Sequence, residues 1–150
     1  MDLDTFFVSC ERLIDSRLNN RPVLIGGTSD RGVVASCSYE ARKFGVKSAM
    51  PSQTAAKLCP GLIFVKPNFE DYKTVSNEIR SIFKRYTSLI EPLSLDEAFL
   101  DVSELPEGFE STTAVAEQIR QEIKAELHLT ASAGVSYNKF LAKMASDQNK

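Results

Sequence analysis

The sequence predicts an α/β (α+β) fold, with a mixed sheet that contains antiparallel strand pairs and carries helices on one face. Short apolar runs alternate with amphipathic stretches along the 150 residues of the chain. Two of these runs, 89–95 and 98–102, flank the acidic pair Asp96-Glu97 and predict a hairpin. Residues from 68 onward are more regular than residues 6–67, which is compatible with a small separate lobe.

The elements expected in the first half of the chain are short. Apolar residues spaced three or four apart predict a helix over 6–18, and Asp4 and Thr5 can cap its amino end. Continuous apolar runs beside turn residues predict three strands: 22–25, 32–35 and 62–65. Helices bounded by glycine or proline are expected over two stretches: 39–44 and 51–60.

The second half carries longer amphipathic helices. Asn68 is the expected cap of the first, whose apolar stripe indicates core packing: Phe69, Tyr72, Val75, Ile79, Ile82, Phe83 and Tyr86. The elements expected after the hairpin are a helix from 111–113 to Leu127, a strand over 131–136, and a helix from Asn138 to Ala145. The single histidine, His128, is interpreted as a helix-end residue and not as a catalytic group.

Composition indicates an ordinary globular domain. A hydrophobic fraction of 43% and a charged fraction of 25% exclude disordered and fibrous classes. No apolar stretch approaches the ~20 residues of a membrane helix, and we expect no signal peptide. Cys10, Cys37 and Cys59 lack CxxC spacing, which predicts reduced thiols and no zinc site. These observations favour a cytoplasmic protein without a membrane partner.

Acidic residues occur at two places where strands end. Asp2 and Asp4 lie directly before the first helix, and Asp96-Glu97 lies at the hairpin turn. If the two strands are neighbours, Asp2, Asp96 and Glu97 converge at one edge and repel unless cations neutralise them. Their oxygen ligands suit two Mg²⁺ ions, for which Mn²⁺ can substitute, as in phosphoryl transfer. The alternative from spacing alone is a solvated turn and a frayed terminus, and Asp4 is expected to be structural.

Four ordered segments carry a family resemblance. They are Asp2-Leu3-Asp4-Thr5-Phe6-Phe7 with Glu11, residues 38–47, residues 94–101, and 133–136 with 138–150. Together they resemble the motifs of Y-family DNA polymerases, most closely the amino-terminal part of the bacterial polymerase IV (DinB) branch. The resemblance implies a palm formed by residues 1–5 and 68–150 and inserted fingers formed by 6–67. The family's thumb and little finger would lie outside this chain.

The resemblance also implies site residues. Asp2 and Asp96 would ligate both metal ions, Glu97 the ion that activates the primer hydroxyl, and the Leu3 carbonyl the nucleotide-bound ion. The nucleotide contacts would be the backbone at Phe6 and Phe7 and the side chains of Ser36, Tyr39, Arg42 and Lys150. The Phe7 ring would act as a steric gate that leaves no room for a 2′-hydroxyl. The alternatives are that Phe7 is a core residue and that Arg42 belongs to a solvated helix face.

The implied activity is template-directed, low-fidelity translesion DNA synthesis, of the mutator type that responds to DNA damage in DNA repair. Its partners would be primer-template DNA, a dNTP and, in a full-length protein, a sliding clamp, in the cytoplasm of a bacterium at the nucleoid. Two other classes stay open. A nucleotidyl cyclase uses similar palm chemistry on ribonucleotides, and a non-catalytic fragment could act as a binding module.

The net charge of −2 argues against a basic DNA-binding face. A family member would have about half a dozen residues before Asp2, forming the strand that carries it, and would continue past Lys150. We therefore expect this chain to be a catalytic-core fragment, with most phosphate contacts to DNA in the other parts. Whether the isolated fragment is active stays open.

Overall fold

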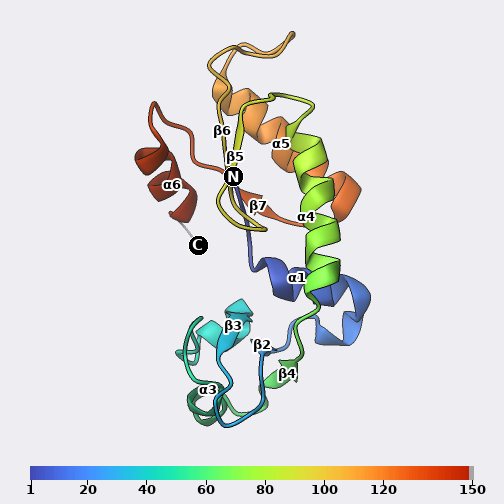
Figure 1. The fold of residues 1–150 in the computed structure, drawn as a ribbon, viewed down its shortest axis with the longest axis vertical. Coiled ribbons are helices and arrows are strands. Elements are labelled where there is room, and N and C mark those ends of the chain that lie inside the picture. Colours follow the sequence, from blue (N-terminus) through green and yellow to red (C-terminus); the bar gives the residue numbers. More distant parts are fainter. Residues whose placement is uncertain (149–150) are drawn as a thin grey trace. The chain divides into compact units, whose positions relative to one another are not determined.

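The computed structural model describes residues 1–148, which form two compact units. The larger unit contains residues 1–4 and the chain from Lys73 onward, and the smaller unit is Thr5–Tyr72 (Figure 1). Helices and strands are mixed in both units, which confirms the α+β class. Among the described helices, none is long and apolar enough to cross a membrane.

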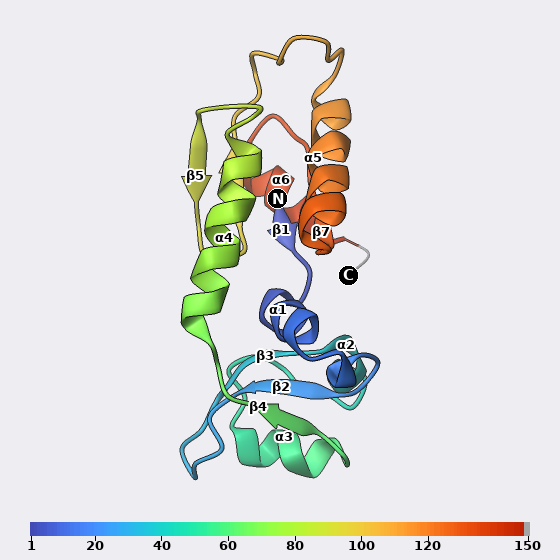
Figure 2. The ribbon, with the colours of Figure 1, turned by 90° about the vertical axis from the view of Figure 1, so that its right-hand side faces the viewer.

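The smaller unit is built on a three-stranded sheet with the order β3-β2-β4. Strand β2 (Val23–Gly26) pairs antiparallel with β3 (Val34–Cys37) and parallel with β4 (Ile63–Val65). Every residue of β2 is buried, because helices cover both faces of the sheet. Figure 2 shows α1 and α3 on opposite sides of these strands. The bounds of the helices are Phe6–Ile14 for α1, Tyr39–Arg42 for α2 and Ser52–Leu58 for α3.

The first helix differs from its prediction at both ends. Thr5 occupies the cap position with φ 41°, and its side chain makes no capping hydrogen bond. The predicted side-chain cap by Thr5 is therefore wrong. The Asp4 carboxylate accepts a hydrogen bond of 2.7 Å from the Ser132 hydroxyl. Helix α1 stops before Asp15, whose carboxylate accepts from the backbone N–H of Arg17 and begins a separate 3-10 turn, Ser16–Leu18.

An aromatic cluster of Phe7, Phe69 and Tyr72 packs at α1. Phe69 is 48% exposed, so its predicted core position is wrong, because its ring lies at the edge of the cluster. The Phe7 and Tyr72 rings are stacked, with centroids 4.3 Å apart and planes 12° apart. The Phe69 ring meets Phe7 edge-on at 5.8 Å. Tyr72 is fully buried, and its hydroxyl donates a 2.6 Å hydrogen bond to the buried carboxylate of Glu11. Burial and this hydrogen bond raise the pKa of Tyr72, so its hydroxyl stays a donor at neutral pH.

The larger unit contains two antiparallel strand pairs joined by a single bridge. Strand β1 (Asp2–Leu3) pairs with β7 (Ala131–Ser132), and β5 (Ile90–Pro92) forms the predicted hairpin with β6 (Ala98–Leu100). An antiparallel bridge between Asp2 and Glu97 places β1 beside the hairpin. Met1 and Ala98 exchange two backbone hydrogen bonds at the same junction. The strands therefore follow the spatial order β5-β6-β1-β7.

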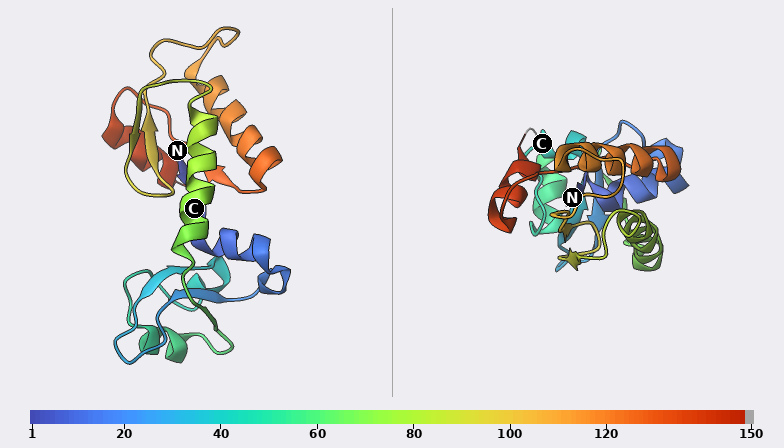
Figure 3. Two further views of the ribbon diagram at one scale, coloured as in Figure 1. Left: turned by 45° about the vertical axis from the view of Figure 1, so that its right-hand side comes forward. Right: turned by 90° about the horizontal axis from the view of Figure 1, so that it is seen from above.

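The helices of this unit lie on both sides of the strands. Their bounds are Phe69–Phe83 for α4, whose first turn belongs to the smaller unit, Thr112–Leu127 for α5 and Lys139–Asp147 for α6. Figures 1 and 3 show α4 and α5 on one side and α6 on the other, whereas the sequence predicted helices on one face only. Gly134 permits this arrangement, because a Cβ there would lie 1.9 Å from the Ala142 carbonyl oxygen of α6.

The predicted amino-terminal caps of these three helices are confirmed, while α4 ends at Phe83, before Tyr86, and α6 continues to Asp147, past the predicted Ala145. The side chains of Asn68, Ser111 and Asn138 accept hydrogen bonds from the first turns of α4, α5 and α6. His128 caps the carboxyl end of α5 in the left-handed conformation. Strand β7 is shorter than predicted, because the chain turns at Gly134 to meet α6 and leaves the ladder.

We predict that Tyr72→Phe lowers the free energy of unfolding by about 1–3 kcal/mol, because Glu11 would lose its hydroxyl donor in a buried position. Chemical denaturation followed by circular dichroism measures this loss. Tyr137→Phe is the matched control, since that ring is fully exposed and its replacement should cost little. Equal stability of the two variants would contradict the role given to the Tyr72–Glu11 hydrogen bond.

We predict that Gly134→Ala destabilises the protein by about 1–3 kcal/mol, because α6 must move away from the new methyl group. Thermal unfolding measures the effect. Gly27→Ala is the control, because a Cβ at that position meets its nearest neighbour at an ordinary 3.4 Å. A Gly134→Ala variant as stable as the control would mean that α6 is not packed against this segment.

Candidate active site

Backbone pairing brings three acidic residues of the larger unit together. The Leu3 N–H donates a 2.9 Å hydrogen bond to the Asp96 carbonyl, and Asp2 bridges to Glu97 across the strands. Leu3 is only 3% exposed, so it anchors β1 in the core between two acidic neighbours. Backbone hydrogen bonds within the hairpin turn stabilise it, because the N–H groups of Leu93 and Ser94 both donate to the Glu97 carbonyl. The convergence expected from the sequence is therefore present in the backbone.

The Asp96 carboxylate lies in an unfavourable environment for its charge. It is half-buried and accepts a 2.8 Å hydrogen bond from the Ser94 hydroxyl. Burial raises the pKa of Asp96 above its ordinary value, and the charges of Asp2 and Glu97 raise it further against the opposing effect of Ser94. A raised pKa means that the ionised form costs folding free energy at neutral pH. Positive charge beside Asp96 would relieve that cost.

One positive charge is already present at the site. The Lys143 ammonium of α6 donates a 3.0 Å hydrogen bond to Oε2 of Glu97. This contact raises the pKa of Lys143, and the charges of Asp147 and Asp2 add to the effect. Lys143 is not among the site residues predicted from the sequence. The signal that was available is its spacing of four from Lys139, which places both lysines on one face of α6.

The donor set suits a divalent cation of the Mg²⁺ type. Asp2, Asp96 and Glu97 offer only oxygen ligands, which Mg²⁺ and Mn²⁺ prefer. Lys143 marks the position as one where the protein accommodates a cation. The described residues include no group of three His, Cys, Asp or Glu side chains already arranged for coordination. The backbone positions fit, while the Asp96 and Glu97 side chains are turned toward Ser94 and Lys143.

The predicted phosphate contacts that the structure describes lie in the smaller unit. Ser36 lies in β3, and Tyr39 and Arg42 lie at the two ends of α2. Tyr39 and Arg42 are exposed, and the Arg42 guanidinium sits over the Tyr39 ring, 5.0 Å from its centroid. This stacking limits the motion of both side chains. Lys150 lies outside the described residues.

The amino end of α1 supplies the remaining predicted nucleotide contacts. Phe6 and Phe7 form the first turn, where backbone N–H groups and the helix dipole favour an anion. Phe6 is 2% exposed, so its ring belongs to the core and only its backbone is available. Phe7 is partly exposed and stacked on Tyr72, so one ring face is packed as the core alternative expected, while the ring also keeps exposed surface.

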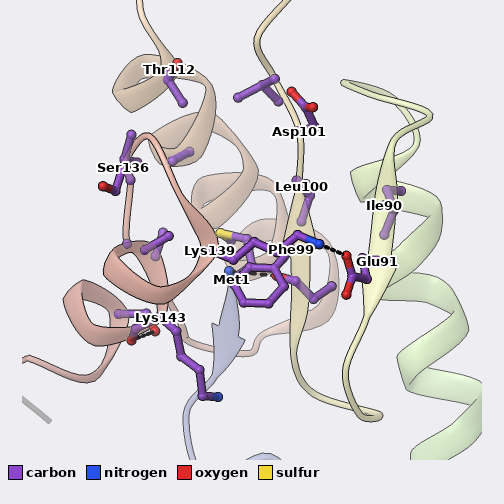
Figure 4. Close-up of a pocket in the computed structure, with 18 of the residues that line it drawn as sticks. Met1, Ile90, Glu91, Phe99, Leu100, Asp101, Thr112, Ser136, Lys139 and Lys143 are labelled. Atoms are coloured by element: carbon purple, nitrogen blue, oxygen red, sulfur yellow. Dashed lines mark hydrogen bonds and ion pairs between the residues drawn. The ribbon is translucent and has the colours of Figure 1, made fainter.

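A pocket of about 1000 Å³ lies in the larger unit, next to the acidic residues (Figure 4). Its walls are mainly apolar and include residues 99–103 and 133–137. These two segments follow the two neighbours of β1, which are Glu97 on one side and β7 on the other. Of the candidate site residues that the structure describes, only Asp2 and Glu97 border it. The candidate site is therefore defined by the carboxylates and not by this cavity.

Comparison with known proteins relates this arrangement to polymerases. Residues 1–147 match the impB/mucB/samB family. The chain is 60% identical over 150 residues to DNA polymerase IV 2 of Agrobacterium fabrum, covering all of this chain and 42% of that protein. It is 56% identical over 151 residues to DNA polymerase IV of Clostridioides difficile, covering 41% of that protein. The chain thus spans less than half the length of these relatives.

Solved structures show the same fold. A Y-family DNA polymerase chimera, Dbh-Dpo4(243-245)-Dbh, matches with a TM-score of 0.92 and 36% identity over 99% of this chain and 45% of that chain. An insertion ternary complex of Dbh DNA polymerase matches with a TM-score of 0.91 and 37% identity, covering 99% and 45% respectively. On the sequence match over residues 1–147 and these structural matches, this chain belongs to the impB/mucB/samB family of Y-family DNA polymerases.

Proposed function

We propose that these residues carry the catalytic core of a DNA-directed DNA polymerase, which transfers a deoxynucleotide from a dNTP to a primer 3′ end and releases pyrophosphate. The observation that carries the proposal is the pairing of β1 with the hairpin, which gathers Asp2, Asp96 and Glu97. Relatives named DNA polymerase IV support the reaction class.

We assign the palm to residues 1–5 and 68–150 and the fingers to 6–67. The junctions between the compact units, Asp4 to Thr5 and Tyr72 to Lys73, lie close to these boundaries and support the division. On this assignment the carboxylates belong to the palm. The Tyr39–Arg42 pair and Phe7 belong to the fingers.

The carboxylates would hold two Mg²⁺ ions, with Mn²⁺ as a substitute. Asp2 and Asp96 would share both ions, Glu97 would hold one, and the Leu3 carbonyl would complete the other. When bound, such ions activate the primer hydroxyl and neutralise the triphosphate and the departing pyrophosphate. The protein's part is positioning: β1 and the hairpin fix the acids, and Ser94 orients Asp96.

The dNTP would be held through its phosphates and selected through its sugar. Arg42 can bind phosphate with two parallel hydrogen bonds, and its stacking on Tyr39 limits the entropy lost on binding. Ser36, Lys150 and the amides at Phe6 and Phe7 would complete the phosphate contacts. The Phe7 ring, packed against Tyr72 and Phe69, is rigid enough to exclude a 2′-hydroxyl.

We also propose low fidelity, tolerance of damaged templates, a sliding-clamp partner and a location at the bacterial nucleoid, on the resemblance to Y-family polymerases alone. Two competing functions have less support. A cyclase acts on ribonucleotides, so a rigid ring at Phe7 that excludes a 2′-hydroxyl does not fit it. A binding module without catalysis does not explain a half-buried Asp96 among like charges.

We predict that Asp96→Asn, in the complete polypeptide that carries these residues, lowers the rate of primer extension at least about a thousandfold, because one shared metal ligand loses its charge. Single-nucleotide extension of a labelled primer measures the rate, and circular dichroism checks the fold. Asp101→Asn is the matched control: that carboxylate lies just beyond β6, where it accepts hydrogen bonds from Ser103. Primer extension that survives in Asp96→Asn would overturn the two-metal assignment.

We predict that Phe7→Ala raises the relative use of ribonucleotides roughly a hundredfold, because the sugar 2′-hydroxyl then has room. The ratio of kcat/KM for dCTP to kcat/KM for CTP measures this discrimination. Phe44→Ala, which removes an exposed ring from the same unit, should leave the ratio unchanged. A ratio unaltered by Phe7→Ala would remove the gate assignment while leaving the carboxylate site standing.

A further inference from the structure

The Lys143 side chain places a positive charge at the carboxylate that the proposed function assigns to one of the metal ions. Its ammonium lies 3.0 Å from Oε2 of Glu97, and the two side chains are 46% and 28% exposed. The negative charge of Asp2 also helps to raise the pKa of Lys143. An oxygen that accepts from an ammonium cannot at the same time offer that lone pair to a divalent ion.

The position of Lys143 is built into the fold. Asn138 caps the first turn of α6, and Gly134 lets this helix lie directly against the neighbouring segment. One turn after its cap, α6 carries Lys143, and the Lys143 carbonyl accepts a 2.8 Å hydrogen bond from Ser146. Lys139, four residues earlier on the same face, pairs instead with Glu91 of β5, as Figure 4 shows. The two lysines thus neutralise different carboxylates.

We propose that Lys143 acts as an internal cation that stabilises the carboxylate site in the metal-free protein, and that a divalent ion displaces it from Glu97. This inference rests on the proposed function, since it takes Glu97 as a metal ligand. Lys143 relieves repulsion among Asp2, Asp96 and Glu97 while no ion is bound. The same charge opposes the entry of a divalent ion. Lys143 therefore stabilises the metal-free protein and lowers its affinity for the metal.

Titration with Mn²⁺, followed by electron paramagnetic resonance in the absence of DNA and nucleotide, tests the proposal in the complete polypeptide. Asp96→Asn defines how much Mn²⁺ binds outside the site. Lys143→Met should bind Mn²⁺ roughly three- to tenfold more tightly than the wild-type protein, because one competing positive charge is gone. Lys139→Met should bind Mn²⁺ as the wild-type protein does, because its partner Glu91 lies outside the site.

Thermal unfolding gives a second readout. Without metal, Lys143→Met should unfold at a lower temperature than the wild-type protein. Saturating Mn²⁺ should reduce this difference in unfolding temperature. Suppose that the wild-type protein binds Mn²⁺, that Asp96→Asn abolishes this binding, and that Lys143→Met binds Mn²⁺ no more tightly than the wild-type protein. This result would overturn the inference on Lys143 and leave the proposed function standing. A wild-type protein without any Mn²⁺ binding that depends on Asp96 would overturn the proposed function and this inference with it.

Discussion

The candidate site depends on one short stretch of backbone pairing. Strand β1 contains only Asp2 and Leu3, yet it is hydrogen-bonded to β7 on one side and to the hairpin turn on the other. Leu3 supplies the apolar anchor, and the alternation of a strand then directs Asp2 away from the core. Without this pairing the acidic residues at the amino end and at residues 96–97 would have no common location. The chemistry of the site therefore follows from the register of β1.

Bringing the carboxylates of Asp2, Asp96 and Glu97 together costs electrostatic free energy, and two hydrogen bonds offset part of that cost. Ser94 donates to Asp96 and Lys143 donates to Glu97, while burial and the neighbouring charges keep the pKa of Asp96 raised. The repulsion that remains among these carboxylates favours the binding of a cation at the site. The smaller unit uses a different principle. There ring stacking on Tyr72 holds Phe7, and the neutral Tyr72 hydroxyl donates a hydrogen bond to the buried Glu11 carboxylate.

Local patterns predicted most elements well, because caps and apolar spacing act within a few residues. The side chains of Asn68, Ser111 and Asn138 cap the helices as expected. Long-range contacts account for the misses. The Asp4 carboxylate accepts a hydrogen bond from Ser132, 128 residues away, and α6 lies on the opposite side of the strands from α4 and α5, with its backbone close to Gly134. The contact of Lys143 is also long-range, since its partner Glu97 lies 46 residues earlier in the chain, so local spacing does not predict it.

The most direct test of the account is nucleotide binding by the complete polypeptide, measured by calorimetry with dCTP and with CTP, in the presence and absence of Mg²⁺. The account predicts that dCTP binds only with Mg²⁺, that CTP binds more weakly, and that Asp96→Ala abolishes the metal-dependent part. Binding that is independent of Mg²⁺ and unchanged in Asp96→Ala would contradict the claim that β1 and the hairpin assemble a metal-dependent nucleotide site.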